Sequence, residues 1–121
     1  MEIKELVMKA HSNAVEKGFY TIEDSIVSKL YRNAELTDEE CNAVINAFRC
    51  EKLLLVITEV AEATEALRKG ESETANFKEE IADVVIRIGD LSGSCGIDLD
   101  AEITNKMEIN KNRTYKHGKL F

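Results

Sequence analysis

The chain has 121 residues, a net charge of −7, no proline and only 6% aromatic residues. This length suits a single domain covering residues 1–121, with a core small enough to gain from oligomerisation. The acidic balance argues against general binding to nucleic acid or to an anionic membrane. Apolar residues recur at helical spacing without strand-like alternation, so the sequence predicts an all-α domain of four to five helices.

The cysteines and the first residues bear on the compartment. Cys41, Cys50 and Cys95 are odd in number and lack a CxxC spacing, which favours free thiols in a reducing cytosol. No apolar run reaches transmembrane length, and the N-terminal residues lack the apolar core of a signal peptide. We therefore expect a cytoplasmic protein that does not enter a membrane.

The first third of the chain predicts two helices. Residues 2–17 are expected to form the first, which Gly18 ends. Its apolar face consists of Ile3, Leu6, Val7, Ala10, Ala14 and Val15. His11 lies beside this face, where a half-buried histidine bonded to a backbone group is the ordinary outcome. A weaker helix is expected at residues 22–31, followed by a loop.

Thr37 and Glu40 have the spacing of a capping box, so a long helix is expected to begin there. Helical spacing continues to residue 69, with a break near residues 47–50 left open. A turn at 70–74 and a helix at 75–92 follow. Asp98 or Asp100 can cap a last helix. Its inward-facing residues are expected to be Ile97, Leu99, Ile103, Met107 and Ile109.

Two pairs of acids mark the long helix and the helix after it. Glu59 and Glu62 are three residues apart, as are Glu80 and Asp83, and residues at this spacing share one helix face. At about 100° per residue, the first pair falls within the apolar arc of its helix. That arc contains Phe48, Leu55, Val56, Ala63 and Ala66. The second pair borders an arc of Phe77, Ile81, Val84, Val85, Ile88 and Leu91.

Antiparallel packing of these two helices through their apolar arcs would bring all four carboxylates together, with Arg87 the only cation nearby in the second segment. Converging carboxylates in an apolar setting repel each other unless a positive charge lies between them. Hard divalent cations prefer oxygen ligands, so Mg²⁺ is the expected ion, with Mn²⁺ as the alternative. A single acid pair is common on solvated helix faces; the two adjacent pairs together carry this prediction.

Residues 106–121 reverse the charge of the chain, with five cations and Glu108 as the only acid. Lys106, Asn110 and Arg113 stand at i, i+4 and i+7, on one face of the last helix and its exit. A lysine, an amide and an arginine on one face suit a phosphate group, because arginine offers a planar fork and lysine a point charge. Cations at a helix C-terminus also simply complement the helix dipole, and that interpretation stays open.

The acid pattern carries a resemblance to a known family. Glu59-x-x-Glu62, then seventeen residues, then Glu80-x-x-Asp83 resembles the signature of the MazG-type all-α nucleoside triphosphate pyrophosphohydrolases. The segment 106–118 is similar to the C-terminal end of many members, and His11 with Gly18-Phe19 fits an early part of the pattern. Residues 21–47 carry no motif and are interpreted as a lineage-specific elaboration.

The resemblance implies a helical bundle of that type, assembled as a dimer or tetramer with substrate near subunit interfaces. It implies Mg²⁺-dependent cleavage of a nucleoside triphosphate to the monophosphate and pyrophosphate. The four acids would then be the metal-binding and catalytic residues, with Glu59 or Glu62 as a possible general base. Phosphate binding falls to Lys106, Asn110 and Arg113, and contact with the base or sugar falls to His11 and Phe19.

Two other interpretations remain beside this hydrolase hypothesis. The chain could be a related metal-dependent hydrolase of another pyrophosphate-containing substrate, such as phosphoribosyl-ATP or a dinucleotide. It could also be a non-catalytic helical dimerisation module whose acids are solvated. The apolar setting of Glu59 and Glu62 speaks against the second of these, and base preference is not readable.

Overall fold

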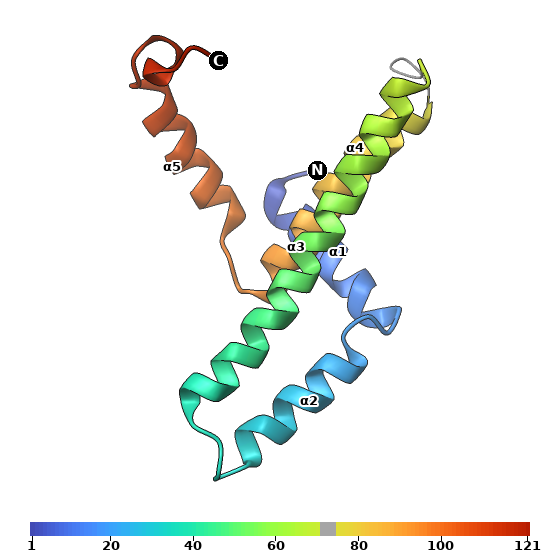
Figure 1. The fold of residues 1–121 in the computed structure, drawn as a ribbon, viewed down its shortest axis with the longest axis vertical. Helices are drawn as coiled ribbons and strands as arrows, with labels where there is room; N and C mark the ends of the chain where they lie inside the picture. The colour runs from blue at the N-terminus through green and yellow to red at the C-terminus, as the bar shows by residue number, and fades with distance from the viewer. Residues whose placement is uncertain (71–74) are drawn as a thin grey trace.

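The computed structural model describes residues 1–70 and 75–121 (Figure 1). Within those ranges the chain forms five α-helices, one short 3₁₀ turn and no strand. They are α1 (Ile3–Glu16), α2 (Thr21–Arg32), α3 (Asp38–Arg68), α4 (Ala75–Ser94), α5 (Leu99–Lys111) and the turn η1 (Tyr115–Gly118). The all-α prediction is confirmed. The turn expected at 70–74 lies, apart from Gly70, outside the described residues.

Helix α3 is a single helix of 31 residues, about 46 Å long at the usual rise. It begins with the expected capping box, in which the Glu40 amide donates to Thr37 Oγ1 (3.1 Å) and the Thr37 amide donates to Glu40 Oε2 (3.0 Å). No break occurs at residues 47–50, because the helix contains neither glycine nor proline. Asp98 caps α5 by accepting a hydrogen bond from the Ala101 amide (3.2 Å).

The helices pack around α3 and α4. Helix α4 runs back antiparallel along the second half of α3, and α1 packs against α4 (Figure 1). Helix α2 lies beside the first half of α3. Helix α5 meets α1 at its beginning, where Lys4 and Asp98 form an ion pair (4.0 Å), and then projects away from the paired α3 and α4 (Figure 1).

Two glycines of α4 set how closely α1 approaches. A Cβ added at Gly93 would lie 2.6 Å from the Cβ of His11, which is closer than carbon atoms can pack. A Cβ added at Gly89 would lie 3.4 Å from the Cβ of Ala10, an ordinary contact. The absence of a side chain at Gly93 therefore places His11 directly against the backbone of α4.

The expected apolar faces are only partly covered. In and just before α5, the inward orientation predicted for Ile97, Ile103, Met107 and Ile109 is wrong, since all four are exposed. Leu99 alone of that set is half-buried. The reason is geometric: α5 meets α1 at its beginning and then projects away, so the described residues leave the rest of the helix uncovered.

The arcs of α1, α3 and α4 show the same partial covering. Val15, Leu55, Ile81, Val85 and Ile88 are exposed, although each was expected on an inward face. Neighbouring members of these arcs are buried or half-buried, namely Phe48, Val56, Ala63, Ala66, Phe77, Val84 and Leu91. One protomer exposes 9291 Å², whereas a compact monomer of 13.6 kDa exposes about 6,600 Å². The surplus consists in part of large apolar side chains along α3 and α4.

Candidate metal centre and the hollow beside it

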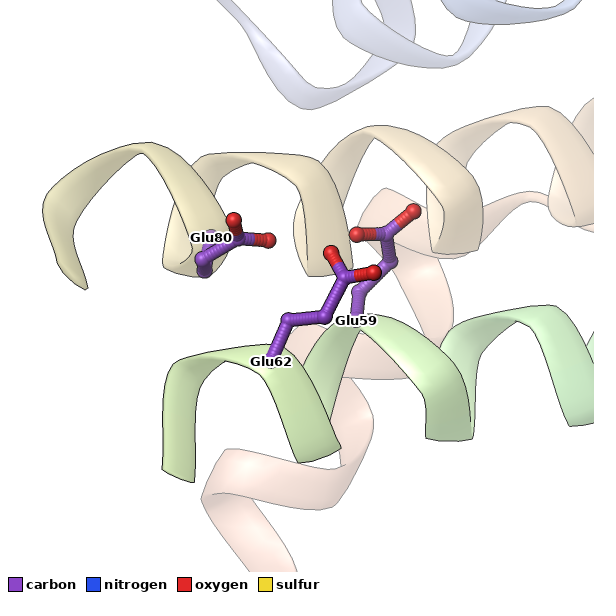
Figure 2. A group of neighbouring side chains, drawn as sticks. All are labelled: Glu59, Glu62 and Glu80. Atoms are coloured by element: carbon purple, nitrogen blue, oxygen red, sulfur yellow. The ribbon is translucent and has the colours of Figure 1, made fainter. Parts of the chain in front are cut away.

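Three of the four predicted acids meet between α3 and α4. Glu59 and Glu62 reach from successive turns of α3 toward Glu80 on α4, as Figure 2 shows. One carboxylate oxygen from each of the three lies within 4.8 Å of the others. Opposite oxygens around a bound Mg²⁺ are about 4.2 Å apart, so small side-chain rotations would bring this trio to coordination distance.

The trio lies in a setting that disfavours bare negative charge. Glu59 is only 8% exposed, while Glu80 is half-buried and Glu62 is exposed. Glu80 Oε2 is buried and accepts no hydrogen bond from the described residues. A buried acceptor without a donor is costly, and its position beside two other carboxylates fits a cation better than another hydrogen bond.

The pKa values of two carboxyls in the cluster are shifted in opposite directions. The guanidinium of Arg87 donates from Nε to Glu59 Oε1, and this bond holds the pKa of Glu59 below its ordinary value. Burial, followed by the neighbouring carboxylate of Glu62, raises the pKa of Glu80 to about 7. Near neutral pH without metal, the cluster therefore retains part of a proton, carried mainly by Glu80.

Asp83 lies just outside this trio. It is exposed, follows Glu80 by three residues, and its charge contributes to the raised pKa of Glu80. With Glu59 it borders a hollow of about 320 Å³ between α1, α3 and α4. The structure thus places Asp83 at the edge of the acid cluster, facing the hollow.

The acid cluster separates two hollows. The second, of about 290 Å³, is open to solvent and lined by Glu62, Glu80 and Lys69 among others. The larger one has an apolar wall made by Ala10, Ala14, Leu55 and Ile86. Its volume falls at the lower end of the range for small-molecule sites. A ligand in either hollow would reach the carboxylates from one side.

Both residues predicted to contact a base or sugar lie near the larger hollow. Phe19 is among its lining residues and is 73% exposed. His11 is half-buried and is bonded through Nδ1 to Asp90 Oδ1 (2.9 Å), so its partner is a carboxylate instead of a backbone group. The hydroxyl of Tyr20 donates to the same oxygen (2.8 Å).

Sequence reasoning missed this network around Asp90. Tyr20 is buried, and burial, more than the nearby Asp90, raises its pKa, which keeps the phenol protonated as a donor. Lys52 lies 4.5 Å from the centre of the Tyr20 ring and forms an ion pair with Glu23 (2.7 Å). The one available signal was the position of Asp90, two helical turns beyond Asp83 on a similar face.

The predicted phosphate-binding residues lie elsewhere in the protomer. Lys106, Asn110 and Arg113 are all exposed, on α5 and directly after it. Figure 1 shows α5 standing apart from the end of the α3–α4 pair that carries the acids. Arg113 Nη1 lies 3.2 Å from His117 Nδ1, within the C-terminal segment itself. The fold of the chain does not bring these residues to the acid cluster.

Comparisons with known protein families, with curated proteins and with solved structures find no match to this chain. Among the described residues, none of the helices has the length and apolar character needed to cross a membrane.

Proposed function

We propose that the protein is a Mg²⁺-dependent nucleoside triphosphate pyrophosphohydrolase that converts a (d)NTP and water to the (d)NMP and pyrophosphate. The observation that carries this proposal is the buried Glu80 Oε2, which accepts no hydrogen bond from the described residues and lies among three clustered carboxylates beside two hollows. The MazG-like acid pattern supplies the reaction class. The residues fit a hard divalent cation, Mg²⁺ or Mn²⁺, with Glu59, Glu62 and Glu80 as ligands and Asp83 beside them.

When bound, such a cation would polarise phosphate oxygens and favour ionisation of a water molecule. The protein's own groups would orient the substrate and accept the proton of the attacking water. Arg87 makes Glu59 a weaker base, so Glu62 is the better candidate for general base, a role that it would take in place of ligating the cation. Asp83 faces the hollow where the α-phosphate would lie.

The position of α5 supports a homo-oligomer, either a dimer or a tetramer. The surplus surface of about 2,700 Å² over a compact monomer is comparable to what a subunit buries in an obligate assembly. Exposed apolar residues on α5 and on the α3–α4 pair would be covered in such an assembly. Lys106, Asn110 and Arg113 of a second copy would then supply phosphate binding to the acid cluster.

Two further parts of the proposal follow from chemistry. The three cysteines are free, which fits a cytoplasmic protein that meets its nucleotide substrate there. The net charge of −7 gives no support for a nucleic-acid partner.

The reaction is tested by measuring pyrophosphate and monophosphate release from a panel of dNTPs and NTPs, with Mg²⁺ and with EDTA. Glu62→Gln and Glu80→Gln should abolish release, whereas Glu65→Gln should retain it. Glu65 is the matched control because it is an exposed glutamate on α3 paired only with Arg68 among the described residues. Full activity of Glu80→Gln, or release that survives EDTA, would refute the metal-dependent mechanism.

The arrangement in the assembly is tested by mixing two impaired variants at a triphosphate concentration well below KM, where Arg113→Ala has little activity. Glu80→Gln lacks a functional acid cluster, and Arg113→Ala lacks a phosphate-binding side chain. If α5 acts on a second copy, mixed oligomers contain one intact site and recover part of the activity. If α5 acts within its own protomer, no mixture recovers activity, and light scattering still reports the oligomeric state.

The two other functional classes are separated by thermal melting. Mg²⁺ that raises the melting temperature of a protein inactive on triphosphates would favour another pyrophosphate-containing substrate, such as phosphoribosyl-ATP or a dinucleotide. Mg²⁺ that leaves the melting temperature unchanged would favour a non-catalytic helical module.

A further inference from the structure

Asp90 stands at the end of the larger hollow away from the metal centre. It belongs to α4, two turns after Asp83, and lines the hollow together with Asn13 and Phe19. None of the acids of the metal centre contacts it through a hydrogen bond among the described residues. Asp90 is therefore separate from the metal centre, in a hollow lined by apolar side chains on one part and by charged ones, among them Lys52 and Arg87, on the rest.

The orientation of the Asp90 carboxylate is fixed by two donors. Tyr20 Oη donates to Oδ1 (2.8 Å), and His11 Nδ1 lies 2.9 Å from the same oxygen. Because a carboxylate oxygen only accepts, the proton of this His11 bond must lie on Nδ1. The rings of His11 and Tyr20 also pack edge to face, with centroids 4.9 Å apart, which holds both donors in place.

The other oxygen of Asp90, Oδ2, accepts no hydrogen bond from the described residues. Asp90 lines the hollow, whereas His11 and Tyr20 do not. Both donors bond to Oδ1, so Oδ2 is the Asp90 oxygen that keeps its acceptor capacity among the described residues. An acceptor held in a fixed orientation in this hollow favours a ligand group that donates a hydrogen bond.

We propose that Asp90 is a specificity-determining residue that accepts a hydrogen bond from the exocyclic amino group of a nucleobase. The inference rests on the proposed nucleotide hydrolysis and names the substrate class within it. The phosphates would lie at the Glu59 and Asp83 end of the hollow, and the base would lie between Phe19 and the apolar wall. Cytosine and adenine present an amino group where uracil and hypoxanthine present a carbonyl oxygen, so the amino member of each of these two pairs should be the preferred substrate.

The same geometry predicts how the preference can be inverted. In Asp90→Asn the two donors Tyr20 and His11 keep the amide oxygen on their side, which turns the amide nitrogen toward the hollow. The side chain then offers a donor where it offered an acceptor. Uracil and hypoxanthine, which present a carbonyl oxygen at that position, become the better partners.

The experiment compares kcat/KM for two matched pairs, dCTP with dUTP and dATP with dITP. Affinities for the non-hydrolysable α,β-imido analogues of dCTP and dUTP, measured by calorimetry with Mg²⁺, give a second readout that does not require turnover. The wild type should favour the amino member of each pair. Asp90→Asn should shift the dCTP/dUTP ratio toward dUTP by about 100-fold in both measurements.

Glu51→Gln is the matched control. Glu51 also lines the hollow, is exposed, and undergoes the same change from carboxylate to amide, so its base preference should stay at the wild-type value. If Asp90→Asn folds poorly, its dCTP/dUTP ratio of kcat/KM cannot be measured. The wild-type ratios of kcat/KM for dCTP over dUTP and for dATP over dITP therefore serve as an independent test.

Equal wild-type kcat/KM within both pairs would overturn the role of Asp90 while leaving the pyrophosphohydrolase proposal standing. Asp90→Asn could instead lower kcat/KM equally for dCTP and dUTP, and removing the 3′-hydroxyl of the substrate could then lower it no further. These two results together would assign the contact to the sugar and overturn the base contact. A wild type that neither binds nor cleaves any nucleotide of the panel would overturn the proposed function, and this inference with it.

Discussion

Binding of Mg²⁺ should release a proton from the acid cluster, and the amount follows from the titration of Glu80. The pKa of this carboxyl is raised to about 7 by burial and by the charge of Glu62. Metal ligands bind as carboxylates, so a cation that binds at the cluster must displace the proton that remains there. With a pKa raised to about 7, more proton should leave at pH 6 than at pH 8.

Calorimetric titration with Mg²⁺ measures this number directly, because the observed heat varies with the ionisation enthalpy of the buffer. Titrations in three buffers at each pH give the protons released as a slope. Glu80→Gln should reduce the slope to near zero even where Mg²⁺ still binds. Glu65→Gln should leave it unchanged, since that glutamate is exposed, is paired with Arg68 and is not one of the three clustered carboxylates.

A slope of zero at pH 6 in the wild type would refute the proposed charge state of the cluster. A slope that persists in Glu80→Gln would place the proton on another group. Because the carboxylates are close enough to titrate as a unit, the measured value belongs to the cluster as a whole.

Three further outcomes are expected. Without metal, the folded protein holds a proton on Glu80 that the unfolded chain loses near its ordinary pKa, so stability should fall as the pH rises from about 4.5 to about 7. Thermal melts across that range should show the fall in the wild type and a smaller fall in Glu80→Gln. Gly93→Ala pushes a methyl group into the histidine of α1 and should destabilise the protein by about 1–3 kcal/mol in urea denaturation. Gly89→Ala has room and should be neutral or stabilising by up to about 1 kcal/mol, so equal effects would contradict the packing argument. Lys106→Ala and Arg113→Ala should raise KM for the triphosphate about tenfold or more yet keep the Mg²⁺-induced rise in melting temperature.

Local features were predictable from the sequence. Thr37 and Glu40 lie three residues apart, so their capping box depends on no distant part of the chain. The same holds for the pairing of acids along α3, since helical spacing alone places Glu59 and Glu62 on one side. The sequence of α3 contains neither glycine nor proline, but helical spacing alone did not decide whether the helix breaks near residues 47–50.

Contacts between distant segments were not predictable. Asp90 meets Tyr20, 70 residues away, and no local pattern marks either residue as a partner of the other. The prediction of which apolar residues are buried failed for a related reason. Periodicity identifies the apolar side of a helix, but it does not show which part of that side a neighbouring helix covers. Thus Val84 is half-buried on α4 while Val85, on the same predicted arc, is exposed.

The close approach of α1 to α4 has a consequence for the order of folding. The α3–α4 hairpin joins segments that are adjacent in the chain, whereas the bond between His11 and Asp90 closes a span of 79 residues. Long loops form later because their closure costs more entropy. We expect α1 to dock after the rate-limiting barrier, which would make Gly93→Ala accelerate unfolding while leaving the refolding rate nearly unchanged in stopped-flow experiments. A refolding rate that falls in proportion to stability would instead place α1 in the folding nucleus. On the expected order, the end of the hollow that holds Asp90 is completed last and opens first.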